Sequence, residues 1–208
     1  MNVFPTNFNP SSHSGPNSFT RGLLSNICRR HDIKISNSLK DADVELSIIE
    51  SHFKKTVPRI IRLDGIYFNS DQDFKSQNSK IRETYLTSDI AIFQSLFNKN
   101  LTESWFGDHP GGTVVRNGAD IDAISKIDKA DLSSTFGERK IWMSASSWRP
   151  HKRLNSNIEY FIRNSEEDDI MLVAGSGASK EDFANYENLI NSRIFYLGHV
   201  DWESLISL

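Results

Sequence analysis

The chain has 208 residues, 38% of them hydrophobic, and a formal net charge of -3 at pH 7. That charge argues against nucleic acid as an obligatory partner, because proteins that bind nucleic acid usually carry a surplus of basic residues. No run of about 18 apolar residues occurs, and the N-terminus lacks the basic and apolar regions of a signal peptide, so we expect a cytoplasmic protein without a transmembrane segment. The histidines lack the spacing of a helical metal site, and we expect no metal and no cofactor.

The first half of the sequence alternates short apolar segments with helical patterns, which is typical of an α/β domain with a mostly parallel sheet. The polar run at 69–79 is expected to form an exposed loop. The single cysteine, Cys28, cannot form an internal disulfide, and we expect it to be buried in a helix. The expected helices lie at 18–31, 80–86 and 96–106, and the expected strands at 2–4, 33–35, 44–49, 57–68, 89–95 and 113–116.

Gly15 lies in a loop that is rich in Pro, Asn and Ser, just before the first expected helix. A residue without a side chain lets the backbone approach a ligand closely, which makes this loop a candidate binding element. Asn17 or Ser18 is the expected helix cap. Loop closure alone explains the glycine equally well.

Arg62 and Asp64 stand two positions apart in an otherwise apolar stretch, so on a strand their side chains face the same side of the sheet. Gly65 ends or bends that strand. Such a pair at the mouth of a cleft could contact a sugar or take part in chemistry. The alternative, a structural ion pair that satisfies itself, is the more common situation. Asn117, in the Asn-Gly turn after the strand at 113–116, can place an amide in a cleft.

A charged segment at 120–138 interrupts the alternation and is the candidate linker. After it the alternation resumes. The expected strands lie at 141–145, 169–174 and 193–198, and the expected helices at 154–163, at 180–191 and after the cap Asp201. In the helix at 154–163 an apolar stripe is formed by Leu154, Ile158, Phe161 and Ile162, at helical spacing, which indicates a core-facing side.

Three cations, Arg149, Lys152 and Arg153, precede the helix at 154–163. Unpaired backbone N–H groups and the helix dipole add to positive potential there, so the cluster is a candidate phosphate site. A solvated basic turn is the alternative. Gly175 and Gly177 follow the strand at 169–174, where glycine relieves crowding as a strand leaves the sheet. The third glycine of a dinucleotide fingerprint and the Gly-Lys-Ser/Thr of a P-loop are missing.

Taken in order, these segments resemble the retaining glycosyltransferases of the GT-B fold, of the glycosyl transferases group 1 (GT4-like) type. The resemblance spans nearly the whole chain. It rests on Ser14-Gly15-Pro16, Arg62-Leu-Asp-Gly65, Ser88-Asp-Ile-Ala-Ile-Phe-Gln-Ser95, Val115-Arg-Asn-Gly-Ala-Asp120, Ser147-Trp-Arg-Pro-His-Lys-Arg-Leu154, Gly175-Ser-Gly177 and Phe195-Tyr-Leu-Gly-His199.

The resemblance implies two Rossmann-like domains with mostly parallel sheets, the second incomplete. Residues 1–122 would form the acceptor-side domain, 123–139 the linker, and 140–208 part of the donor-binding domain. The acidic Glu-x7-Glu segment of the family would follow Leu208, so we expect a chain truncated at its C-terminus.

The implied reaction moves a sugar, with retention of configuration, from a nucleotide-diphosphate sugar to a glycan or lipid-linked acceptor, which leaves peripheral membrane association open. Negative charge grows on the leaving phosphate oxygen, and fixed cations stabilise it without a metal. The alternatives are a non-catalytic module that binds a sugar nucleotide or glycan, and an unrelated phosphate-binding Rossmann protein.

The resemblance also implies roles for single residues. Lys152 matches the family lysine that contacts the donor diphosphate, and the other implied donor-binding residues are Gly15, Asn117, Arg149, Arg153, Gly175 and Gly177. Asp64, with Arg62, lies where the family keeps acceptor-side or catalytic polar residues. Ser147 stands where the family often has an arginine, so Arg149 would have to serve from another position.

Overall fold

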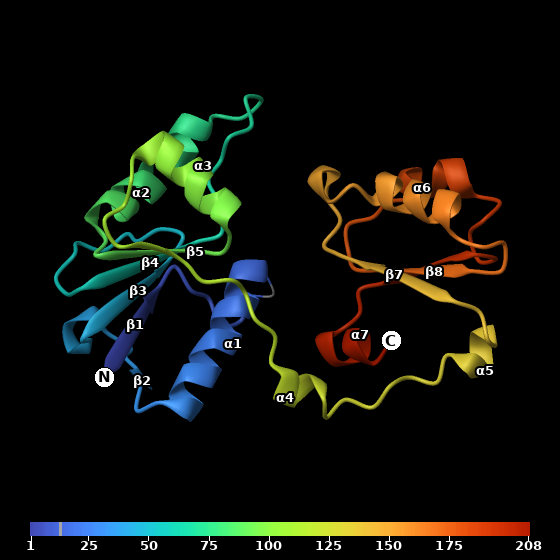
Figure 1. Cartoon of the computed structure of the whole chain (residues 1–208), viewed down its shortest axis with the longest axis horizontal. Helices are drawn as coiled ribbons and strands as arrows, with labels where there is room; N and C mark the ends of the chain where they lie inside the picture. Colours follow the sequence, from blue (N-terminus) through green and yellow to red (C-terminus); the bar gives the residue numbers. More distant parts are fainter. Residues whose placement is uncertain (13) are drawn as a thin grey trace. The chain divides into compact units, whose positions relative to one another are not determined.

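The computed structural model describes residues 1–12 and 14–208, which form two compact units, Met1–Ala119 and Asp120–Leu208. Residue 13, in the loop expected before the first helix, lies outside the described residues. Both units are built on parallel sheets with helices packed against them, which confirms the predicted α/β class (Figure 1). The predicted linker, 123–139, belongs to the second unit. The proposed domain limits stay a prediction.

The first unit holds a six-stranded parallel sheet in the order β2-β1-β3-β4-β5-β6. The chain leaves β1 in one direction to form β2 and returns on the other side to form β3, so the order reverses between β1 and β3. In α/β sheets, ligands bind outside the carboxyl ends of the strands near such a reversal. The strands are β1 (Asn2–Thr6), β2 (Lys34–Ile35), β3 (Val44–Ile48), β4 (Arg59–Leu63), β5 (Ile90–Phe93) and β6 (Gly112–Val114).

Three helices cover this sheet, with α1 on one face and α2 and α3 on the other (Figure 1). Side-chain alternation along β4 decides which residue meets which helix. Ile61 and Leu63 join the buried cluster that includes Ile81 of α2 and Phe106 of α3. Arg62 therefore points to the face that α1 covers. The helices are α1 (Gly15–Arg30), α2 (Phe74–Thr87) and α3 (Leu96–Phe106), and a 3-10 turn, η1, spans Leu39–Asp41.

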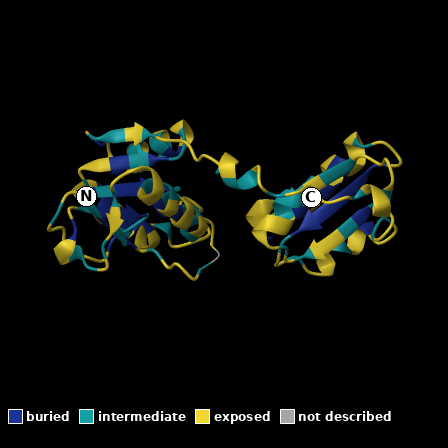
Figure 2. Cartoon of the chain, turned by 90° about the horizontal axis from the view of Figure 1, so that it is seen from below, coloured by how far each residue is buried: buried dark blue, intermediate teal, exposed yellow. Residues whose placement is uncertain are grey.

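The second unit has a three-stranded parallel sheet in the order β7-β8-β9. The predicted stripe on α6 is confirmed for Leu154, Ile158 and Phe161, which are buried against the sheet, whereas Ile162 is exposed. Figure 2 shows the buried residues concentrated on the strands of each unit. The elements are α4 (Ile121–Ile124), α5 (Ser133–Phe136), β7 (Ile141–Ala145), η2 (Pro150–Lys152), α6 (Leu154–Asn164), β8 (Ile170–Ala174), η3 (Glu181–Tyr186), β9 (Ile194–Gly198) and α7 (Trp202–Ser207).

The segment expected to link the domains packs on the second unit. The Phe136 ring of α5 meets the Phe195 ring of β9 edge-on, with 5.0 Å between the centroids. The backbone N–H of Ala130 donates to the carbonyl of Ser207 in α7 over 2.8 Å. In the described part of the chain, no helix is long and apolar enough to cross a membrane.

Four local predictions were wrong. α1 begins at Gly15 with Ser14 as its cap, because Pro16 fits the first helical turn, where its missing N–H costs nothing. α2 begins at Phe74, inside the expected loop, because the Asp73 carboxylate accepts from the backbone N–H of Ser76. The helix expected at 180–191 is the short 3-10 turn η3. Cys28 lies on α1 but is exposed.

Candidate functional site

The first polar region lies at the carboxyl ends of β4, β5 and β6. Arg62, near the end of β4, pairs through Nη1 with the Oδ1 of Asp64, and only 5% of the Arg62 side chain is exposed. Its Nη2 donates to the Oδ1 of Asn117, beyond β6, over 2.8 Å. The guanidinium also lies over the ring of Phe19 in α1, 3.6 Å from the centroid. The structure thus brings together Arg62, Asp64 and Asn117, residues from distant parts of the sequence.

Gln94 completes this network from the end of β5. Its Nε2 donates to the carbonyl of Asp64, and its Oε1 accepts from the Nδ2 of Asn117 over 3.3 Å. Both ends of the Asn117 amide are therefore engaged within the first unit. Because parallel strands bring their carboxyl ends to one edge, a sequence with correctly assigned strands already places these residues at one edge of the sheet. The hydrogen bonds that join them could not be read from it.

The Asp64 carboxylate is fixed but accessible, since 26% of its side chain is exposed. Burial raises the pKa of Asp64 above the ordinary value of an aspartate, and the charge and hydrogen bond of Arg62 partly offset this. Burial likewise lowers the pKa of Arg62, with Asp64 opposing it. A carboxylate that is oriented by a guanidinium and has a raised pKa can accept a hydrogen bond or a proton from a hydroxyl group.

Gly15 is exposed at the first position of α1, and a Cβ atom there would meet nothing within 4 Å. Its geometry therefore does not require glycine. The helix that it begins carries Phe19 one turn later, under Arg62. Gly15 thus lies on the helix that borders the Arg62–Asp64 pair.

The second polar region lies at the carboxyl ends of β7 and β8. Arg149, Lys152 and Arg153 are exposed around the turn η2, and Arg153 adopts a left-handed conformation with φ 55° between η2 and α6. Within residues 1–12 and 14–208 their side chains make no hydrogen bond or ion pair. The predicted basic cluster therefore exists as three solvated cations before α6.

Gly175 and Gly177 allow the loop after β8 to lie against the loop after β7. A Cβ atom at Gly175 would lie 1.8 Å from the carbonyl oxygen of Ser146, and one at Gly177 would lie 2.5 Å from that of Trp148. Both glycines have positive φ, 112° and 93°. Trp148 closes the contact, because its backbone N–H donates to the carbonyl of Ser176 over 2.8 Å. The crowding that these glycines were predicted to relieve thus arises from the close contact between the two loops.

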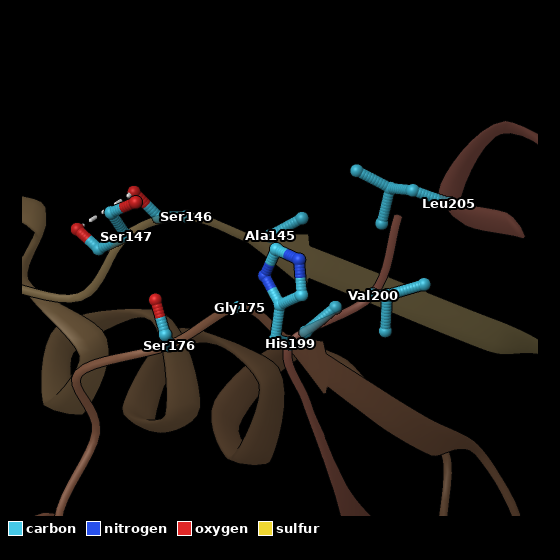
Figure 3. Close-up of a pocket in the computed structure, with 9 residues that line it drawn as sticks. Ala145, Ser146, Ser147, Gly175, Ser176, His199, Val200 and Leu205 are labelled. Atoms are coloured by element: carbon cyan, nitrogen blue, oxygen red, sulfur yellow. Dashed lines mark hydrogen bonds between the residues drawn. The ribbon is translucent and has the colours of Figure 1, made fainter. Parts of the chain in front are cut away.

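A pocket of about 220 Å³ opens beside these loops. Figure 3 shows the imidazole of His199 in its middle, with Ser146, Ser147 and Ser176 on one side and Val200 and Leu205 on the other. His199 follows β9 directly. None of the three cations lines this pocket, and of the two loop glycines only Gly175 does.

His199 is the candidate residue that sequence reasoning missed. It ends the motif Phe195-Tyr-Leu-Gly-His199, and the spacing that reveals a helical metal site says nothing about a single histidine. Its place immediately after a parallel strand was the signal that could have found it, since ligands gather at the carboxyl ends of such strands. In the described part of the chain, no group of three or more His, Cys, Asp or Glu residues could hold a metal ion.

No protein-family model and no curated protein sequence matches the chain. Its structure is similar to that of Anabaena Alr3699/HepE in complex with UDP and glucose, with 11% identity and a TM-score of 0.66, over 97% of this chain and 70% of that one. It is also similar to AviGT4, a glycosyltransferase involved in avilamycin A biosynthesis, with 12% identity and a TM-score of 0.60, over 100% of this chain and 66% of that one.

A third similar structure is UDP-N-acetylglucosamine 2-epimerase from Rickettsia bellii, with 10% identity and a TM-score of 0.59, over 100% of this chain and 71% of that one. At such identities the likeness concerns the fold. The likeness to HepE and AviGT4 and the parallel sheets of both units agree with the predicted architecture. The chain therefore has an α/β fold of the GT-B type.

Proposed function

We propose that the chain acts as a glycosyltransferase, which moves a sugar from a nucleotide-diphosphate sugar to a hydroxyl group of a glycan or lipid-linked acceptor with retention of configuration. One observation carries the proposal: the likeness to HepE, solved with UDP and glucose, runs through 97% of the chain and so includes both units. Function follows from sites rather than from folds, so the two polar regions must also suit the reaction.

The second unit is the proposed donor side. Bond cleavage leaves negative charge on the diphosphate, and Lys152, with Arg149 and Arg153 beside it, offers unpaired positive charge at the start of α6. The adjacent pocket of about 220 Å³ is smaller than the roughly 300–1,000 Å³ of sites that hold whole drug-sized ligands. It therefore suits a part of the donor, such as its phosphates, better than the entire nucleotide sugar.

The first unit is the proposed acceptor side. Asp64 would accept a hydrogen bond from the acceptor hydroxyl, and Arg62 would hold the carboxylate in place. The Asn117 amide, expected to bind the donor, contacts Arg62 and Gln94 instead, which favours a positioning role. Gly15, on the helix that borders this pair, would face the donor phosphates as the family resemblance implies.

The test combines binding and turnover on the same protein. UDP, GDP and ADP sugars are screened by thermal shift, and transfer or hydrolysis of the best ligand is followed by NMR. Retention is checked from the anomeric proton of the product. Asp64→Asn should keep donor binding but lower transfer at least about 100-fold, the lower end for a proton-transfer group. Asp71→Asn, an exposed aspartate of the same unit, is the matched control.

The outcomes separate the alternatives. A wild-type rate for Asp64→Asn would make the Arg62–Asp64 pair structural. Binding without turnover would favour the non-catalytic module. Conversion of UDP-N-acetylglucosamine to its epimer without an acceptor would favour the reaction of the Rickettsia bellii neighbour, which shares the fold. A chain that binds none of these nucleotides would refute the proposal.

A further inference from the structure

We propose that His199 supplies the positive charge that holds a phosphate group inside the pocket of the second unit. This inference rests on the proposed function and adds a residue to its donor site. It names the phosphates, rather than the base or the ribose, as the part of the nucleotide that His199 contacts.

The side chains of the pocket wall leave His199 as the source of charge. Of the nine described residues that line the pocket, His199 has the one ionisable side chain, and the others are small, hydroxylic or apolar. A protonated imidazole carries positive charge and donates hydrogen bonds from both ring nitrogens, which suits it to contact an anion. Figure 3 places the imidazole in the middle of the pocket, between the serines and Val200.

The backbone of the wall is also suited to an anion. Four lining residues, Ser147, Ser176, His199 and Val200, have backbone N–H groups that donate to no acceptor in residues 1–12 and 14–208. The hydroxyls of Ser147 and Ser176 likewise donate to no described acceptor. Clustered N–H and O–H donors without a partner are the usual elements of a phosphate site.

The N–H groups of two residues in the loops after β7 and β8 are engaged within the protein. The N–H groups of Ser146 and Gly175 donate to the carbonyls of Ala174 over 3.2 Å and Gly198 over 2.6 Å. These bonds fix the wall without filling it. Arg149, Lys152 and Arg153 lie outside the lining, so they can assist from the rim but do not occupy the interior.

The test compares ligands with and without phosphate. UDP, uridine and inorganic pyrophosphate are titrated by calorimetry into the wild type and into His199→Gln, which keeps one hydrogen-bonding amide but carries no charge. UDP and pyrophosphate should bind about tenfold more weakly or worse, in line with the loss of a hydrogen bond to a charged group, and uridine should be unchanged. His199→Arg should retain most of the UDP affinity. His31→Gln, an exposed histidine of the first unit, is the matched control.

Each remaining outcome is decisive. An equal loss for UDP and uridine would mean that His199 contacts the nucleoside and would overturn the inference. Unchanged UDP binding by His199→Gln would overturn it too, while leaving the proposed function intact. A wild type that binds neither UDP nor pyrophosphate would overturn the inference, and it would refute the proposed function as well if the GDP and ADP sugars also fail to bind. The melting temperature without ligand verifies folding, and we expect it to be unchanged because the His199 side chain lies at an exposed position.

Discussion

Arg62→Met isolates the interaction that holds the first polar region together. Methionine keeps much of the apolar stem but removes the pair with Asp64, the 2.8 Å hydrogen bond to Asn117 and the cation over Phe19. Asp64 then becomes a largely buried carboxylate with no cation beside it. Removing one member of a buried pair costs about 3–5 kcal/mol, and the partial exposure of Asp64 places this case at the low end. We expect a loss of about 3 kcal/mol in the free energy of unfolding at pH 7.

The loss should depend on pH in a defined direction. Burial already raises the folded-state pKa of Asp64, and Arg62 lowers it; without Arg62 that pKa rises further. A raised folded-state pKa means that the folded protein holds the proton more tightly than the unfolded chain, so stability falls as pH rises through it. Near pH 4, with Asp64 mostly protonated in the folded variant, the deficit should shrink to about 1 kcal/mol, from the lost cation–π contact and hydrogen bond to Asn117.

Urea unfolding at pH 7 and pH 4, followed by circular dichroism, measures both quantities. Lys80→Met is the matched control, because Lys80 forms an exposed pair with Glu83 and should change stability by less than about 1 kcal/mol at either pH. A loss below about 1 kcal/mol at pH 7 would show that the pair is not a stabilising element. An equal loss at both pH values would show that the charge of Asp64 is not the cause.

Two further predictions concern the second unit. Gly175→Ala should destabilise this unit by about 3 kcal/mol or more in urea unfolding, because its Cβ would lie 1.8 Å from the carbonyl oxygen of Ser146 and the residue has φ 112°. Gly118→Ala, in the first unit, is the control: its Cβ would have open space, and the free energy of unfolding should change by less than about 0.5 kcal/mol. Equal effects of the two substitutions would contradict the loop contact. Lys152→Ala should weaken UDP binding about tenfold, measured by calorimetry, without loss of stability. Lys126→Ala, at an exposed lysine of the same unit, should leave the UDP affinity unchanged. An unchanged affinity of Lys152→Ala would show that Lys152 is not part of the donor site.

Hydrophobic periodicity correctly predicted the helix whose ends are marked by a capping residue and a terminating glycine. The helix at 96–106 was placed correctly because Ser95 caps it and Gly107, with φ 92°, ends it. The start of α2 was missed because only polar residues follow Phe74 in its first turns, and its inward face includes Asn78, a buried amide that hydrogen bonds to the backbone of Tyr67. A hydrophobic pattern cannot detect a helix face that is buried through hydrogen bonds.

The candidate site, like the helices, could be predicted only in part from the sequence. Two-residue alternation placed Arg62 and Asp64 on one side, and the structure joins them. Their partner Asn117 lies 55 residues from Arg62, so its contact depends on strand order, which a single sequence leaves open. His199 was missed because the sequence was searched for histidines at metal-site spacing, and not for a single histidine after a strand. Its place in the pocket follows from three loops that meet at one edge of the sheet.

The contact between the loops after β7 and β8 limits how this protein can be altered. The two loops share a register, fixed by the bond from Trp148 to Ser176 and by an indole N–H that donates to the buried carbonyl of Ala174 over 3.0 Å. An inserted residue in either loop would shift that register and expose Trp148, so neither loop can change length alone. The part of the pocket that these two loops form is therefore expected to vary through the side chains of its serines, and not through longer loops.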